Sequence, residues 1–245
     1  MVVSCLSASA QPIVWRLVRL HTAVMMCFVV GVLFNTASAT PDQTFFEDGG
    51  SLLHFDDIDT STGWGILTEP YHGLIFEGFY PFKPSHPRFE GLISEHDLNC
   101  AVSKPNALHG SRYNIDSSIR PMHGHEEPTR LPSITSNDGD TSLNLYSFSV
   151  KPLNFPINSV TFNLRGTVAV GPASPSDGAI KSDLIWRVDF PAGYHEVLNV
   201  SLRDYSHRRW NNLSRIELWA DFNNADITMD WEFCIDDLEL DFNRP

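Results

Sequence analysis

The chain has 245 residues, with 17 Lys and Arg against 30 Asp and Glu, and a formal net charge of −13. Nucleic acids and anionic membrane surfaces repel such an acidic protein, so neither is an expected partner. The length suits one sizeable hydrophobic core, and a single domain over residues 40–245 is expected.

Residues 1–39 are expected to be a signal peptide. Arg16 and Arg19 precede an apolar run at 23–34, and Ala37-Ser38-Ala39 supplies the small residues that precede a cleavage site. The alternative is a membrane anchor, but a spanning helix needs about 20 apolar residues and this run is shorter. The sequence therefore predicts a secreted, extracellular protein that is free of the membrane after cleavage.

An oxidising compartment changes what the cysteines are expected to do. Cys100 and Cys234 remain after cleavage, and a lone pair in a secreted protein usually forms a disulfide. Two unrelated buried thiols are the alternative.

The secreted part also contains two glycosylation sequons. Asn199-Val200-Ser201 and Asn212-Leu213-Ser214 both have the acceptor pattern, so Asn199 and Asn212 are candidate glycosylation sites.

Short runs in which apolar residues alternate with polar ones follow in chain order, and no amphipathic helix longer than about two turns stands out. These runs cover residues 52–58, 71–79, 143–150, 160–170, 184–190, 194–200, 216–222 and 231–242. A long polar loop is expected at about 114–141. The pattern predicts an all-β fold, a two-sheet antiparallel β-sandwich of the jelly-roll type.

The first and last of these runs share an irregularity. In each, the apolar positions change parity across a pair of aspartates, Asp56-Asp57 and Asp236-Asp237. A slip of one residue turns every following side chain to the other face, so a bulge is expected at each pair. The likeness predicts that the first and last strands pair side by side, with their acidic doublets meeting.

Four short motifs occur in an order that resembles a known group of proteins. They are Phe55-Asp56-Asp57-Ile58, Tyr71-His72-Gly73-Leu74-Ile75-Phe76, Ser103-Lys104-Pro105-Asn106 and Ile235-Asp236-Asp237-Leu238. The order resembles small secreted β-sandwich proteins common in fungi, which are similar in layout to jelly-roll carbohydrate-binding modules. The resemblance covers residues 52–242 and implies the fold more than the function.

The binding modules also imply a structural calcium ion that joins the front of the chain to its closing strand. By this resemblance Glu47, Asp57 and Asp236 are the candidate ligands. Calcium takes six to eight oxygen ligands, many of them carboxylates, and it would relieve the repulsion between converging aspartates. The alternative is that these acids are solvated at the ends of the sheets.

Aromatic side chains are the candidates for sugar binding, and the sequence favours Trp64, Tyr71 and Trp210. Trp64 and Trp210 lie in polar, loop-like stretches, where a tryptophan is more often exposed. Trp186, Trp219 and Trp231 occupy strand positions and are expected in the core. Packing over the end of a sheet is the alternative for the two loop tryptophans.

An enzyme is expected less than a binding protein. His123-Gly124-His125-Glu126 could bind a transition metal, but no third ligand follows at a characteristic spacing. The sequence has no G-x-S-x-G, no H-E-x-x-H and no glycine-rich phosphate loop. The leading hypothesis is a non-catalytic protein that binds an extracellular glycan. The alternatives are an interaction or virulence protein that binds a host or matrix protein, and a polysaccharide-active enzyme.

Overall fold

A computed structural model describes residues 50–114, 130–169, 183–205, 209–224 and 227–243. All of them belong to one compact unit, Pro41–Pro245. The expected signal peptide, Glu47, the His123–His125 cluster and most of the expected long loop lie outside the described residues. Within these ranges, no helix is long and apolar enough to cross a membrane.

The described residues form twelve strands and four short helical segments. The strands are β1 (Ser51–Leu53), β2 (Leu74–Glu77), β3 (Phe79–Phe82), β4 (Ala107–Gly110), β5 (Ser133–Ser136), β6 (Ser142–Pro152), β7 (Val160–Val168), β8 (Asp183–Phe190), β9 (Leu198–Ser201), β10 (Leu213–Asn224), β11 (Ile227–Trp231) and β12 (Phe233–Asn243). The helical segments are the 3₁₀ turns η1 (Pro87–Phe89), η2 (Glu95–Cys100) and η3 (Arg112–Asn114), and α1 (Leu202–Tyr205). The all-β expectation is confirmed.

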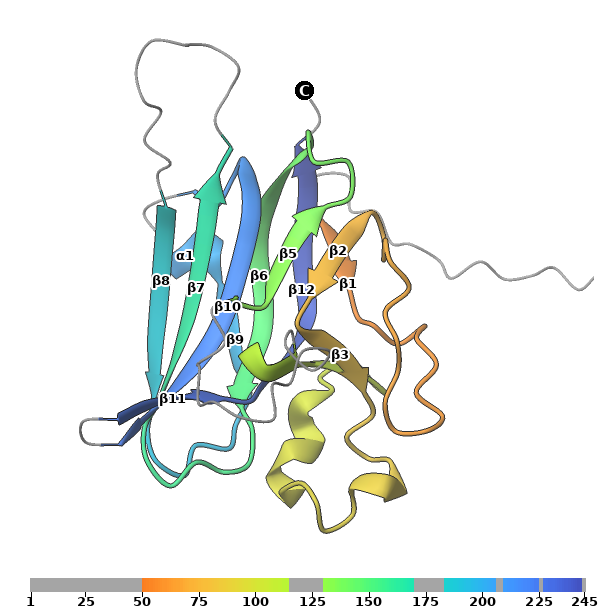
Figure 1. The fold of residues 1–245 in the computed structure, drawn as a ribbon, viewed down its shortest axis with the longest axis vertical. Coiled ribbons are helices and arrows are strands. Elements are labelled where there is room, and N and C mark those ends of the chain that lie inside the picture. The colour runs from red at the N-terminus through yellow and green to blue at the C-terminus, as the bar shows by residue number, and fades with distance from the viewer. Residues whose placement is uncertain (1–49, 115–129, 170–182, 206–208, 225–226, 244–245) are drawn as a thin grey trace, which may run out of the picture. The chain divides into compact units, whose positions relative to one another are not determined.

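The strands form two antiparallel layers. In one layer β6 pairs with β12. β9 pairs with the other edge of β6, and β1 and β4 pair with the other edge of β12. β3 then pairs with β4. In the other, β10 pairs with β7, β5 and β11, β8 follows β7, and β2 follows β5. The layers join where Leu213 of β10 stands opposite Leu143 of β6 (Figure 1).

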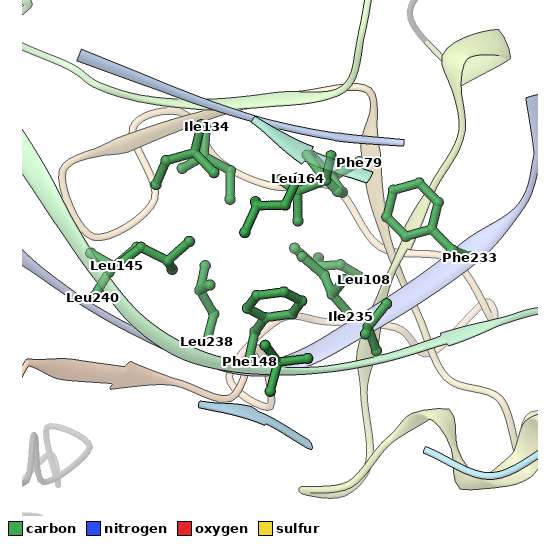
Figure 2. Close-up of a cluster of buried hydrophobic side chains, with 14 of the residues drawn as sticks. Phe79, Leu108, Ile134, Leu145, Phe148, Leu164, Phe233, Ile235, Leu238 and Leu240 are labelled. Carbon is green, nitrogen blue, oxygen red and sulfur yellow. The ribbon is translucent and has the colours of Figure 1, made fainter. Parts of the chain in front are cut away.

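The apolar side chains of both layers meet in a common core. Leu145, Phe148 and Leu240 point inward from β6 and β12, and Ile134 and Leu164 point inward from β5 and β7 (Figure 2). Each of these side chains is at most 2% exposed. The alternating pattern in the sequence is therefore the pattern of a sandwich with an apolar interior between its layers.

The first and last strands lie side by side, as expected. Ser51 stands opposite Leu240, and Leu53 stands opposite Leu238. The bulge at the closing doublet is also confirmed, because Asp236 pairs with Ser149 while Glu239 pairs with Ser147. One extra residue in β12 thus restores the inward parity of the following leucines.

The front doublet differs from the expectation of a bulged strand at 52–58. β1 ends at Leu53, and Phe55 has a φ of 61° where the chain turns. The Ile58 amide then donates to the Phe55 carbonyl at 3.3 Å. The change of parity at Asp56-Asp57 is therefore a tight turn after a short strand.

Two further expectations need correction. The run at 71–79 is divided at Gly78, whose φ is 79°, into β2 and β3, which pair with different layers. The expected loop at 114–141 contains β5, whose Ile134 is fully buried between β2 and β10. The sequence gives no alternating apolar pattern for β5, because serine and threonine surround its one apolar residue.

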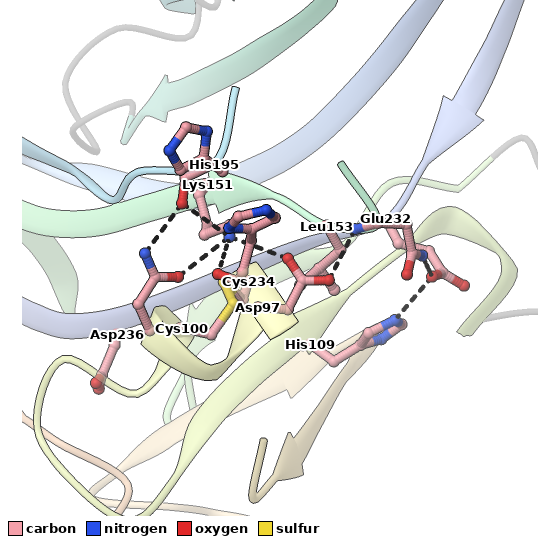
Figure 3. Close-up of a disulfide and its surroundings, with 12 residues drawn as sticks. Asp97, Cys100, His109, Lys151, Leu153, His195, Glu232, Cys234 and Asp236 are labelled. Carbon is pink, nitrogen blue, oxygen red and sulfur yellow. Dashed lines mark hydrogen bonds and ion pairs between the residues drawn. A yellow bond between two sulfur atoms is a disulfide. The ribbon is translucent and has the colours of Figure 1, made fainter. Parts of the chain in front are cut away.

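The expected disulfide between Cys100 and Cys234 is present (Figure 3). It joins the last residue of η2 to β12 across 134 residues of sequence. A second, smaller apolar cluster surrounds it, formed by Phe82, Phe89, Cys100, Ala101, Ala107, Leu153 and Cys234. We call this group the disulfide cluster; it fixes the irregular segment 83–106 to the closing strand.

Candidate functional site

Trp64 lies in an open groove beside the disulfide cluster, which we call the Trp64 groove. Its volume is about 720 Å³. The Trp64 ring is half-buried and packs against Phe82 at 5.7 Å and edge-on to Phe89 at 5.2 Å between ring centroids. A backbone bridge between Trp64 and Phe82 holds the residue beside β3. The indole is therefore placed firmly and still lines an open surface.

A second aromatic side chain faces the same groove from β3. Tyr80 is 40% exposed, and its hydroxyl donates to the Asn114 carbonyl at 3.3 Å. Ile66 and Leu92, exposed by 84% and 73%, form an apolar rim. Aromatic side chains supplied by separate segments give the groove apolar surfaces on which a flat ligand can rest.

One end of the groove is polar. His109 Nδ1 lies 3.1 Å from the Asn114 side-chain amide nitrogen, and His109 Nε2 lies 3.8 Å from Glu232 Oε2. Because the Asn114 amide group donates, we assign the ring proton to Nε2, which faces Glu232 (Figure 3). Asn154 also donates to the Glu232 carboxylate, at 2.9 Å.

These contacts set the charge at the polar end. The His109 imidazole, whose Nε2–H faces the carboxylate, and the hydrogen bond from Asn154 hold the pKa of Glu232 below its ordinary value, although burial opposes them. Glu232 is therefore an ionised acceptor at neutral pH. The groove thus combines aromatic surfaces with an ionised acceptor and amide groups.

Tyr71, the second expected sugar-binding residue, lies in the core. Its side chain is 8% exposed, and its ring stacks on Phe55 at 5.7 Å between centroids. The hydroxyl donates to Asp57 Oδ1 at 2.7 Å, and burial raises the Tyr71 pKa well above its ordinary value. This residue fixes the front turn and offers no ring face to a ligand.

Trp210, the third, was expected to be exposed and is only 3% exposed. Its ring covers Gly166, where a Cβ atom would lie 3.0 Å from the indole. The Trp210 carbonyl accepts from the Leu145 amide at 2.8 Å, so the backbone of Trp210 is bound to β6. The polar composition around Trp210 therefore predicted exposure wrongly, because the ring packs over the end of the sandwich.

The acidic doublets are held together by the segment 103–106. Asp236 is fully buried and accepts from the Ser103 amide at 3.0 Å, while Asp56 accepts from the Asn106 amide at 3.0 Å. Asn106 in turn donates to the carbonyls of Phe55 and Ile58, each at 2.9 Å. Three of the four sequence motifs, those at 55–58, 103–106 and 235–238, therefore meet in one buried polar junction.

This junction bears on the calcium expectation. Burial, and then the charges of Asp237 and Asp56, raise the Asp236 pKa to about 8. Asp57 is engaged by Tyr71 instead. No group of three or more His, Cys, Asp or Glu side chains in the described part could hold a metal ion. Because Glu47 lies outside that part, the calcium site stays a prediction.

Both sequon asparagines are exposed. Asn199 lies on β9 and its side-chain oxygen accepts from Ser149 at 2.8 Å, and the Asn212 amide donates to the Asn144 side chain at 3.0 Å. Glycosylation at either remains a prediction.

Asn199 also lines a second hollow of about 870 Å³ outside β6, β12 and β1. In this hollow His54 Nδ1 lies 2.8 Å from Asp237 Oδ1. Phe148 is its one aromatic lining residue among those described, and that ring is buried. The Trp64 groove is therefore the better candidate for stacking on a ligand.

Trp219 was expected in the core and lies instead on the outer face of β10, half-buried. Its Nε1 donates to Asp221 Oδ2 at 3.0 Å, and the Arg165 guanidinium lies over its ring at 5.7 Å. The sequence contained the signal, because Glu217 and Asp221 share its parity. Trp186 shares its parity with buried Leu184 and is packed against the core, as expected.

The binding residues that the sequence favours do not include Tyr80, His109 or Glu232, although Tyr80 is among its candidate aromatic side chains. His109 belongs to β4, which the alternation did not reveal, and Glu232 falls between two strands. Only the folded structure, which brings the three side chains to one groove, identifies them as candidate binding residues.

Comparisons with known proteins give little further information. A scan of family models and a search of curated proteins found no match. One solved structure that the search matched to this chain is a DUF4465 family protein from Bacteroides caccae, 10% identical in sequence. The match covers 80% of this chain and 94% of that one, with a TM-score of 0.41. It assigns no ligand or activity to this chain.

Proposed function

We propose that the chain is a secreted, non-catalytic protein that binds a saccharide in the Trp64 groove. The observation that carries the proposal is that Trp64 and Tyr80, from separate segments, line one open groove. A pyranose ring has an apolar face that suits an aromatic ring, and its edge hydroxyl groups suit the polar end. Glu232 and Asn154 would accept from and donate to those hydroxyl groups.

Secretion is supported by two independent features. The pattern over residues 1–39 is typical of a signal peptide, and a disulfide that clamps the fold suits an oxidising compartment. A structural calcium ion at Asp236 remains part of this proposal. Its support is the buried carboxylate, which gains from a counter-ion.

The experiment is a calorimetric titration of the purified protein with each member of a panel of neutral oligosaccharides. We expect Tyr80→Ala to weaken binding by about fivefold, since stacking on an aromatic ring is worth on the order of 1 kcal/mol. Tyr113→Ala is the matched control, because Tyr113 is 59% exposed and does not line the groove. Equal loss in both variants, or no binding to any glycan, would contradict the proposal.

Trp64→Phe gives a second check that keeps an aromatic ring on Phe82 and Phe89. Its melting temperature shows whether the disulfide cluster has kept its packing. A folded variant with unchanged affinity would remove Trp64 from the binding site.

A protein partner is the second candidate, and the exposed rim favours it. Ile66 and Leu92 are far more exposed than most large apolar side chains, and such residues beside a groove mark protein contacts. A glycan panel without binding, together with loss of a host-protein complex in Ile66→Asp but not in Ile157→Asp, would select this function. Ile157 is 82% exposed and lies outside the groove.

A further inference from the structure

Strand β8 forms an open edge of its layer. It pairs with β7 along its whole length and with no other described strand, and Figure 1 shows it as the outermost strand of that layer. With eight residues it is the longest strand with one described neighbour; the others, β1, β2, β3, β9 and β11, have at most five. An unpaired edge of this length is a template for another strand.

The side chains of β8 are arranged symmetrically about Ile185. Ile185 itself is 57% exposed on the outer face. Asp183 lies two residues before it and Arg187 two residues after it, both exposed on the same face. On the inner face, Leu184 and Trp186 occupy the positions on either side of Ile185. The strand therefore carries opposite charges at equal distances from an exposed apolar centre.

We propose that two copies of the chain pair antiparallel through β8, with Ile185 opposite Ile185 of the second copy. In this register Asp183 faces Arg187 of the second copy, and the reverse pair forms by symmetry. Leu184 likewise faces Trp186 of the second copy, twice. One strand pairing thus forms two ion pairs and continues the apolar interior of one layer across the dimer axis.

The charges on β8 are available for this pairing. Arg187 forms no ion pair with the residues that the structure describes, although it stands opposite Asn163 of β7. Asp183 accepts from the Thr167 hydroxyl at 3.2 Å through Oδ1, and its second oxygen remains for a cation. Arg187 therefore gains an ion-pair partner in the dimer, and Asp183, which already lies within electrostatic range of Arg165, gains a second cation.

A register centred on Val188 would also match opposite charges, because Arg187 would then face Asp189. It is less favourable because of its backbone hydrogen bonds. Pro191, which would enter the ladder opposite Ile185, has no amide hydrogen to donate.

A pairing of this size buries little surface, so the dimer is expected to be concentration-dependent. Light scattering after gel filtration, over concentrations from micromolar to millimolar, measures it directly. The mass should rise from one to two copies as concentration increases, and high salt should weaken the association. A single-copy mass throughout would overturn the proposal.

Charge exchange tests the register. Arg187→Asp places two negative charges opposite each other in both pairs and should abolish the dimer, while its melting temperature stays unchanged. Combining it with Asp183→Arg should restore the dimer. Arg88→Asp, an equal change of charge on η1, is the control and should leave the dimer intact. Restoration by Asp189→Arg instead of Asp183→Arg would overturn the Ile185 register.

Discussion

The sandwich core and the disulfide cluster are stabilised in different ways. In the core, successive strands present alternate apolar side chains. Leu143, Ile216 and Ile235, for example, are fully buried and pack in the apolar cluster. Segment 83–106, by contrast, has two short 3₁₀ turns and no strand. Regular strands distribute stability over many contacts, whereas an irregular segment depends on a few specific bonds.

Those specific bonds lie around Lys151 (Figure 3). Its ammonium group is fully buried, lies 3.0 Å from Asp97 Oδ1 and donates to the His96 carbonyl at 2.7 Å and the His195 carbonyl at 3.2 Å. Burial lowers the Lys151 pKa, and Asp97 opposes that change. The ion pair and the disulfide fix the same segment, since Asp97 and Cys100 both belong to η2.

The largest effect is expected in the core. Phe233→Ala should lower the free energy of unfolding by about 3–5 kcal/mol, because it leaves a cavity among well-packed rings. Phe233 is fully buried and its ring lies 5.2 Å from that of Phe162. Urea denaturation measures the loss, which should appear as a single transition of the whole domain.

The exposed Phe155, 42% accessible, is the control. Its replacement by alanine should cost much less than that of Phe233. Similar losses in both variants would mean that the core is not packed as described.

Removal of the disulfide should have the next largest effect and should be local. Replacing Cys100 and Cys234 together by serine is expected to cost about 2–5 kcal/mol. Because the bond joins η2 to β12, its loss should first free the irregular segment 83–106. Hydrogen exchange should show early opening around η2 and the Trp64 groove, while β7 and β10 remain protected. Uniform loss of protection across both regions would contradict the distinction between them.

Per pH unit, the smallest effect concerns the junction at Asp236. Its pKa is about 8 in the folded protein and near 4 when unfolded, so the folded state holds a proton that the unfolded state releases between these values. Its stabilising contribution is complete below about pH 4 and falls by up to about 1.4 kcal/mol per pH unit as the pH rises to about 8. Melting temperatures across this range measure the slope.

Asp236→Asn cannot ionise and should lose that slope, whatever its stability at one pH. Calcium added at pH 8 gives a further comparison. A rise in melting temperature in the natural protein, absent from Asp236→Asn, would support the calcium expectation. A slope of equal size in both proteins would contradict the pKa assignment.

Much of the sandwich could be predicted because its signals are local. Alternation revealed most of the long strands, and the doubled aspartates correctly placed the first strand beside the last. β5 could not be found in this way, because Ile134 is its only apolar residue and its strand pairing is supplied by β2 and β10.

The candidate site was predicted only in part. Trp64 was named from its loop-like surroundings, and the same argument failed for Trp210, since polar neighbours do not show where the ring points. Tyr80, His109 and Glu232 come from separate segments that only folding brings together. For Trp219 the sequence did contain the answer. Its charged neighbours Glu217 and Asp221 lie on the same side of the strand and indicate an outward-facing ring, but tryptophan residues in strands were all expected in the core.

The position of β12 in the sequence has a consequence for biogenesis. β1, β4 and β6 all depend on β12 as a neighbour, yet it is synthesised after every one of them. Their layer cannot assemble while the ribosome is still producing the earlier strands. If the chain is secreted as proposed, a delay of this kind would keep the nascent polypeptide unfolded while it passes through the secretion channel.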